Sequence, residues 1–237
     1  MKISVSSYSF SQQFRLGKMT QLDCVAKAKE MGFDAIEFTD LVGDDLAQQK
    51  EYAKKIRQEA DRVGIEINAY TIGANLFQPT PEAQAAEVER LKGQVEVAAI
   101  LGAKVMRHDV CYALGKTGAS RSFGLMLPTI ADGARQVTAY AETLGIKTCT
   151  ENHGYIAQDS YRVEQLFNAV AHDNYGLLVD IGNFLCADED PAMAELLARK
   201  SVGLRDTPEG WQVLARALRA LGREEEASLA EAHASVG

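Results

Sequence analysis

Gly145-Ile-Lys-Thr-Cys-Thr-Glu-Asn-His-Gly154 is a short stretch in which β-prone residues are followed by three polar ones. The polar residues are Glu151, Asn152 and His153. A parallel strand that is buried on both faces ends in a polar loop, and ligands bind at such strand ends. We therefore interpret the carboxylate and the imidazole as parts of a binding site, although ordinary loop polarity would give the same local pattern.

A second apolar run, Gly176-Leu-Leu-Val-Asp-Ile-Gly-Asn183, ends in the same way and supplies Asp180. Two acids at the ends of successive strands of one sheet can converge on one metal ion. Carboxylate oxygens suit Mg²⁺ or Mn²⁺, and an added imidazole would widen the choice to Zn²⁺ or Co²⁺. The two strands therefore predict a divalent metal site formed by Glu151 and Asp180.

Glycines separate helix-like segments from β-prone segments at intervals of 31 to 43 residues. Each glycine ends or follows a segment with apolar residues at helical spacing, and each interval has room for one strand, one helix and two loops. The pattern predicts an α/β chain that repeats a strand and a helix. These glycines are Gly32, Gly64, Gly102, Gly145 and Gly176.

Two architectures fit such a βα array, an open doubly wound sheet and an eight-stranded barrel. A doubly wound sheet usually binds its ligand through a glycine-rich turn after the first strand, and Ser6–Phe10 contains no glycine. We therefore predict a TIM-barrel-like (β/α) array. It is incomplete, with about six βα units. Beyond Pro191, the sequence indicates only a helix at Ala192–Arg199 and a stub of a seventh strand at Ser201–Asp206.

The end of the chain has a different character from the βα array. From Pro208 it is rich in Ala, Leu, Arg and Glu, and it predicts a helical hairpin that is weakly tetratricopeptide-like. The alternative is that an Ala-rich helical hairpin matches the tetratricopeptide pattern by coincidence. We divide the chain into a barrel domain of residues 1–200 and a helical tail of residues 201–237. One hairpin cannot bury its own apolar face, so the tail should pack on the barrel or on another chain, as in a homo-oligomer.

Composition narrows the class of partner. The net charge of −8, without a cluster of Lys and Arg, disfavours binding to nucleic acid. The sequence contains no run of about 18 apolar residues, so it predicts no membrane span. The four cysteines lie far apart in sequence, which fits a reducing cytoplasm. A small-molecule partner is the remaining expectation.

Other polar residues also fall at predicted strand ends and form a second rank of candidates for contacts with that small molecule. Glu37 ends the second strand, and Arg107 and His108 end the fourth. His108 and His153 are each suited to act as a metal ligand, a substrate hydrogen-bond partner or a general acid. Arg107 is a candidate phosphate clamp, although exposed arginines without a special role are common.

Three motifs give the chain a family resemblance: Gly32-Phe-Asp-Ala-Ile-Glu37, Glu151-Asn-His-Gly154 and Val179-Asp-Ile-Gly-Asn183. Through them, residues 1 to about 195 resemble the sugar phosphate isomerase/epimerase family of xylose isomerase-like TIM barrels. The C-terminal tail departs from the family pattern.

The resemblance implies a function for the strand ends. In the family, a Glu after strand five and an Asp after strand six bind a divalent ion, and these match Glu151 and Asp180. A His from strand seven and a Glu from strand eight complete the family's site, and neither is recognisable in this chain. Many members have a His where this chain has Asn183, which we take as a substrate-binding candidate.

The activity implied is that of a sugar or sugar phosphate isomerase or epimerase. The ion, Mn²⁺, Mg²⁺, Co²⁺ or Zn²⁺, would polarise a carbonyl while Glu151 moves the neighbouring proton. Glu37, Arg107, His108, His153 and Asn183 would contact the sugar. The alternative is a non-catalytic barrel remnant, or a rearranged product, whose tail mediates protein association.

Overall fold

The computed structural model describes residues 2–115, 118–189, 199 and 208–235. Six strands form one sheet in which their spatial order is the order of the sequence, and the pairs from β1 to β5 are parallel. A doubly wound sheet would reverse direction at a switch point, whereas a barrel adds each strand beside the last. The predicted TIM-barrel-like α/β array is therefore confirmed. The strands are β1 (Ser4–Ser6), β2 (Ala35–Thr39), β3 (Glu66–Ile72), β4 (Val105–His108), β5 (Lys147–Glu151) and β6 (Tyr175–Leu178).

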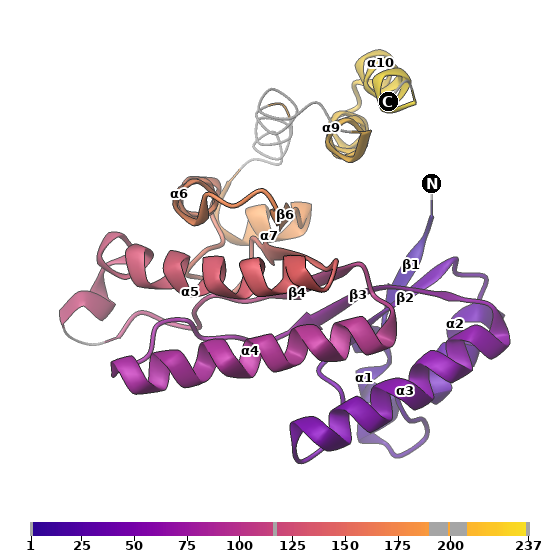
Figure 1. The fold of residues 1–237 in the computed structure, drawn as a ribbon. Helices are drawn as coiled ribbons and strands as arrows, with labels where there is room; N and C mark the ends of the chain where they lie inside the picture. Colours follow the sequence, from indigo (N-terminus) through magenta and orange to yellow (C-terminus); the bar gives the residue numbers. More distant parts are fainter. Residues whose placement is uncertain (1, 116–117, 190–198, 200–207, 236–237) are drawn as a thin grey trace. The chain divides into compact units, whose positions relative to one another are not determined.

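Helices follow the strands as the glycine spacing predicts (Figure 1). None of the helices in the described ranges combines the length and apolar character that a membrane span needs. The α-helices are α1 (Ser11–Arg15), α2 (Asp23–Glu30), α3 (Leu46–Val63), α4 (Pro81–Leu101), α5 (Phe123–Thr143), α6 (Ser160–Val170), α7 (Ile181–Cys186), α9 (Pro208–Ala220) and α10 (Glu224–Ala234). Two short 3₁₀ helices are η1 (Ser7–Phe10) and η2 (Gly118–Arg121).

Local sequence explains where the long helices begin and end. Asp45 caps α3 by accepting a hydrogen bond from Gln48 N, and Thr80 caps α4 in the same way through Ala83 N. Gly64 and Gly102 end these two helices with φ values of 71° and 74°, a left-handed conformation that costs other residues about 1 kcal/mol or more. Gly32 and Gly145 are also left-handed, while Gly176 lies inside β6.

The register divides the sheet into a helix-facing side and an opposite side. Phe38, Tyr70 and Met106 are fully buried, and Tyr70 donates a 2.8 Å hydrogen bond to Gln94 of α4. These residues pair across β2, β3 and β4 in one row. Because side chains alternate along a strand, the next row of paired residues lies on the opposite side. That row contains Thr39, Thr71 and Arg107.

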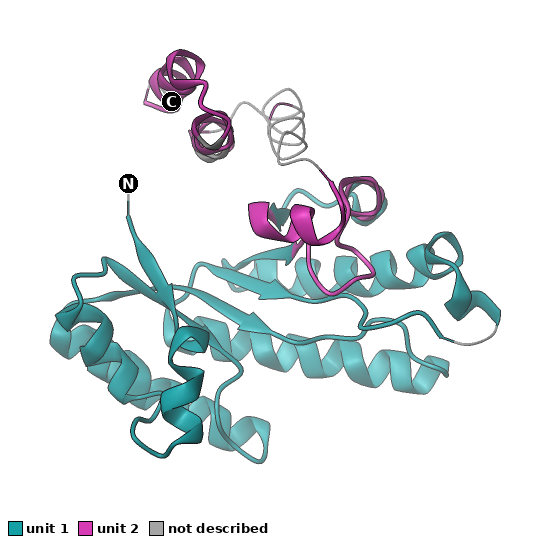
Figure 2. Ribbon diagram, turned by 180° about the vertical axis from the view of Figure 1, so that it is seen from behind, with its two compact units in different colours: residues 1–150, 167–177 teal, residues 151–166, 178–237 magenta. Residues whose placement is uncertain are grey.

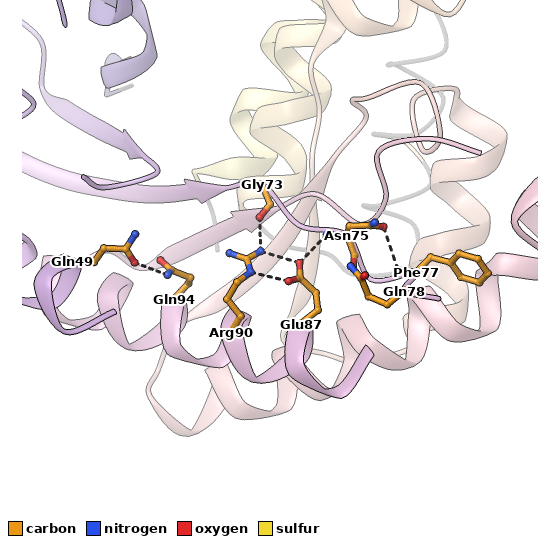
Figure 3. Close-up of polar contacts among 8 residues, drawn as sticks. All are labelled: Gln49, Gly73, Asn75, Phe77, Gln78, Glu87, Arg90 and Gln94. Carbon is orange, nitrogen blue, oxygen red and sulfur yellow. Dashed lines mark hydrogen bonds and ion pairs between the residues drawn. The ribbon is translucent and has the colours of Figure 1, made fainter. Parts of the chain in front are cut away.

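Polar side chains of α4 hold the loop that follows β3 (Figure 3). Arg90 donates a 2.8 Å hydrogen bond to the carbonyl of Gly73 and forms an ion pair with Glu87, which accepts a 2.9 Å hydrogen bond from Asn75 N. The loop at the carboxyl end of β3 is thereby fixed to the helix beneath it.

The described residues group into two compact units (Figure 2). Of the described residues, those within 1–150 and 167–177 form one unit, and those within 151–166 and 178–237 form the other. The predicted domain boundary between residues 200 and 201 and the predicted strand at Ser201–Asp206 lie outside the described residues, as does most of the predicted helix at Ala192–Arg199.

The tail forms the predicted helical hairpin. Leu214 and Leu218 of α9 pack against Ala227 and Ala230 of α10, with Trp211 at the margin of the cluster. A second face of α9 is also buried, because Ala217 packs against Phe184 of α7 together with Val179 and Ile181. Within its unit, the tail is therefore joined to the segment that follows β6.

Candidate active site

Asp180 lies between β6 and α7 and serves as the N-cap of α7. Its Oδ1 accepts hydrogen bonds from the backbone N–H groups of Gly182, at 2.7 Å, and Asn183, at 3.2 Å. The expected strand over Gly176–Asn183 thus ends at Leu178, because an aspartate with extended backbone geometry starts a helix there.

Glu151, the last residue of β5, is linked to Asp180 through one asparagine. Asn183 Nδ2 donates a 3.0 Å hydrogen bond to Glu151 Oε1, and the backbone N of the same residue contacts Asp180 Oδ1. The structure therefore brings together three of the predicted site residues, the two carboxylates and Asn183. Glu151 is half-buried, which leaves part of its side chain accessible.

Asn152 holds the backbone of Asp180 through a reciprocal pair of hydrogen bonds. Its Nδ2 donates to the carbonyl of Asp180 at 2.7 Å, and its Oδ1 accepts from Asp180 N at 2.7 Å. Asn152 is only 1% exposed. Asn152, which directly follows Glu151, is therefore bonded to the backbone of Asp180, the residue with the second carboxylate.

Further polar groups between β5 and the first residue of α6 also bond to the segment that follows β6. Gln158 is buried, donates a 3.0 Å hydrogen bond to the carbonyl of Asn183 and accepts a 2.9 Å hydrogen bond from Tyr155 N. Ser160 bonds to the carboxylate of Glu189 through both its backbone N and its Oγ. The sequence analysis did not predict the roles of Asn152 and Gln158. The one indication of a role for Asn152 was its position directly after Glu151.

His153 is exposed on this loop, and its backbone N donates to the carbonyl of Ala157 at 3.2 Å. His153 directly follows Asn152, and its contact with a substrate stays a prediction.

The remaining predicted residues belong to the other unit, on β2 and β4. Glu37 is half-buried and accepts a 3.4 Å hydrogen bond from Ser6 Oγ. Arg107 is 5% exposed and forms a 2.9 Å ion pair with Asp109. The Arg107 guanidinium is thus held by a neighbouring carboxylate within the protein.

His108 is fully buried. Its Nδ1 lies 2.8 Å from the carbonyl of Asp109, and its ring centroid lies 6.4 Å from that of Tyr175. Burial lowers the pKa of His108 because the charged imidazolium would lose its hydration. A carbonyl accepts hydrogen bonds only, so the neutral ring carries its proton on Nδ1. The structure places this imidazole in the core, and its predicted substrate contact stays a prediction.

The carboxylates of Glu151 and Asp180 are ligands of the type that hard divalent ions take. Glu151 and Asp180 each carry two carboxylate oxygen atoms, and Mg²⁺ in proteins is often held by one or two carboxylates together with water and substrate. Within the described ranges, no group of three or more His, Cys, Asp or Glu side chains is placed to hold a metal. Glu151 and Asp180, which both contact Asn183, are the two residues that would hold an ion.

Comparisons with known proteins bear on the family. The model of the xylose isomerase-like TIM barrel family matches residues 25–210. No curated protein matches the chain in sequence.

Solved structures of the same fold are similar to the chain at low identity. D-psicose 3-epimerase, determined in the presence of D-fructose, is 18% identical with a TM-score of 0.67, over 94% of this chain and 82% of that one. The 3-keto-D-glucoside 4-epimerase of E. coli is 16% identical with a TM-score of 0.68, over 93% and 88% of the two chains. The IolI protein, determined with a zinc atom, is 18% identical with a TM-score of 0.63, over 82% and 68%. The extent of the family match, together with this fold, shows that the chain belongs to the xylose isomerase-like TIM barrel family.

Proposed function

We propose that this protein is a divalent-metal-dependent sugar isomerase or epimerase that transfers a proton at a carbon next to a carbonyl group. The observation that carries the proposal is that Glu151, the last residue of β5, and Asp180, just beyond β6, both contact Asn183. The family and the epimerases of similar fold support the reaction class.

In this proposal Glu151 is the catalytic residue and Asp180 is the second metal ligand. The bound ion would supply Lewis-acid polarisation of the sugar carbonyl. Glu151 would take the proton from the neighbouring carbon, and a positioned base of this kind contributes roughly 10²- to 10⁴-fold to the rate. Asn183 fixes the orientation of the carboxylate through its hydrogen bond to Oε1.

The surroundings of Arg107 favour a neutral sugar over a sugar phosphate at that residue. A phosphate clamp needs guanidinium donors that face the ligand, whereas Arg107 is nearly buried and paired with Asp109. His153 is exposed and follows Glu151 by two residues, and we assign it to recognition of a sugar hydroxyl.

We also propose a cytoplasmic location, supported by four cysteines that are all free thiols.

The test is incorporation of deuterium from D₂O into D-fructose, D-psicose or L-ribulose in the presence of Mn²⁺, followed by proton NMR. This exchange detects proton abstraction even when the accumulated product is small. The parent protein should exchange the proton next to the carbonyl, and Glu151→Gln should lower the rate by roughly 10²-fold or more.

Glu66→Gln is the matched control, because Glu66 is the first residue of β3 and lies at the opposite end of a strand. It should keep the parental rate. Absence of Mn²⁺-dependent exchange with all three ketoses, or equal rates in the parent and Glu151→Gln, would contradict the proposed function.

A further inference from the structure

We propose that Asn152 is a positioning residue that sets the place of Asp180 relative to Glu151 and thereby determines the affinity for the metal ion. This inference rests on the proposed function. The Asn152 side chain would not bind the ion itself, because both of its polar atoms are bonded to the backbone of Asp180.

The first step of the argument is geometric. β6 ends at Leu178, and Asp180 lies beyond it. Asn152 presents an amide N–H and an amide oxygen to the carbonyl and N–H of Asp180, both at 2.7 Å. One side chain thus supplies the two hydrogen bonds that a neighbouring peptide group would supply in a sheet, at a point past the end of the strand.

The second step concerns burial. Asn152 is 1% exposed, so water does not compete for these two bonds. Hydrogen bonds in such surroundings are stronger electrostatically, and their loss leaves the N–H and the carbonyl of the half-buried Asp180 without these partners. Replacement of the amide would therefore change the position or the order of the Asp180 backbone.

The third step concerns chain distance. Asn152 directly follows Glu151, so one peptide unit and one pair of hydrogen bonds connect the two carboxylate-bearing residues. The Asp180 carboxylate itself accepts hydrogen bonds from Gly182 N and Asn183 N, which are local and move together with α7. Asn152 therefore fixes the position of Asp180 and of the start of α7 relative to Glu151.

The chain offers a matched control at the other end of the same two strands. Asn174 Nδ2 donates a 2.7 Å hydrogen bond to the carbonyl of Ile146, just before β6 and β5 respectively. Asn174→Ala thus removes a side-chain to backbone bond of equal length from a place away from the carboxylates. A purely structural role for both asparagines would make the two alanine variants alike.

The experiment is a titration of the full chain with Mn²⁺, followed by electron paramagnetic resonance of the free ion, with circular dichroism to establish folding. Loss of residues that orient metal ligands typically costs 10- to 100-fold in affinity. Asn152→Ala should therefore raise the Kd for Mn²⁺ by about 10-fold or more. Asn174→Ala should change it by less than about twofold.

Asn152→Asp provides a second variant that is close in shape and decides the matter if Asn152→Ala does not fold. It keeps the acceptor for Asp180 N and loses the donor to the Asp180 carbonyl. The added negative charge alone would tighten Mn²⁺ binding, so weaker binding supports the positioning role. Parental or tighter binding in this variant, or equal Kd values for Asn152→Ala and Asn174→Ala, would overturn the inference alone. Failure of the parent protein to bind Mn²⁺ would instead overturn the proposed function.

Discussion

The side-chain amide of Asn183 donates a 3.0 Å hydrogen bond to Oε1 of Glu151. The backbone N of the same residue contacts Asp180, so a neutral group bridges two carboxylates. Carboxylates that share a small space repel each other unless a donor or a cation lies between them. The amide therefore stabilises the arrangement of the two acids in the protein without metal.

Replacement of this amide by a carboxylate should make folding more dependent on metal. Asn183→Asp places a third negative charge against Glu151, at a cost on the order of 1 kcal/mol in partly solvated surroundings. For a chain of this size, Tm should fall by roughly 2–4 °C without metal. Saturating Mn²⁺ should raise Tm by more in Asn183→Asp than in the parent. Thermal unfolding with and without Mn²⁺ checks this, and an equal Mn²⁺-induced shift in the two proteins would speak against it.

The buried imidazole of His108 should make the protein less stable in acid. Burial lowers the pKa of His108, so the unfolded chain takes up a proton near pH 6.5 that the folded chain takes up only at lower pH. The free energy of unfolding should therefore fall as the pH drops below about 6.5. His108→Gln removes this proton uptake. The loss of stability between about pH 7.5 and pH 5.5, measured by urea denaturation, should then be smaller than in the parent. An unchanged loss would show that His108 does not contribute.

Tyr175 and Thr150 form a buried pair whose loss can be measured by a double-mutant cycle. The Tyr175 hydroxyl donates a 2.5 Å hydrogen bond to Thr150 Oγ1, and both residues are almost fully buried. Tyr175→Phe leaves the threonine oxygen without this donor and should lower the free energy of unfolding by about 1–3 kcal/mol. The double variant Tyr175→Phe with Thr150→Val should recover much of the loss, because neither polar group remains. Simple additivity of the two single effects would refute the coupling.

The packing of the tail on α7 should be sensitive to charge at one position. Ala217 is 3% exposed and packs against Phe184. Ala217→Asp would bury an unpaired carboxylate and should lower Tm by roughly 5 °C or more. Arg216→Asp, at the neighbouring exposed position, is the control and should have a much smaller effect. Trp211 is the one tryptophan of the chain and lies in the tail, so its fluorescence reports the transition there. Equal Tm values for the two variants would contradict this packing.

The sequence predicted the βα array because its signals are local. Glycine at the end of a helix and apolar residues in the following run mark each βα unit independently of the rest of the chain. Gly64 and Gly102 illustrate this, since both end a helix in the left-handed conformation. The end of β6 was harder to predict, because Val179 and Ile181 continue the apolar run past Leu178. The helix cap at Asp180 overrides that pattern.

The two carboxylates could be selected from their positions at strand ends, but the groups that hold them could not. Asn152 and Gln158 act through the backbone of Asp180 and Asn183, more than 20 residues away in sequence. Such contacts depend on the three-dimensional path of two loops, and a polar residue in a loop has no periodicity that would indicate its partner. The same reason explains Arg107, whose side chain is paired and nearly buried although its position suggested a ligand clamp.

The central claim is that Glu151 and Asp180 share one divalent ion. The most direct measurement is the anomalous difference density of Mn²⁺ in crystals of the protein soaked with MnCl₂. The account predicts one Mn²⁺ ion with oxygen atoms of both Glu151 and Asp180 at roughly 2.0 to 2.6 Å. Mn²⁺ bound only elsewhere, or bound to one of these carboxylates while the other remains out of reach, would contradict it.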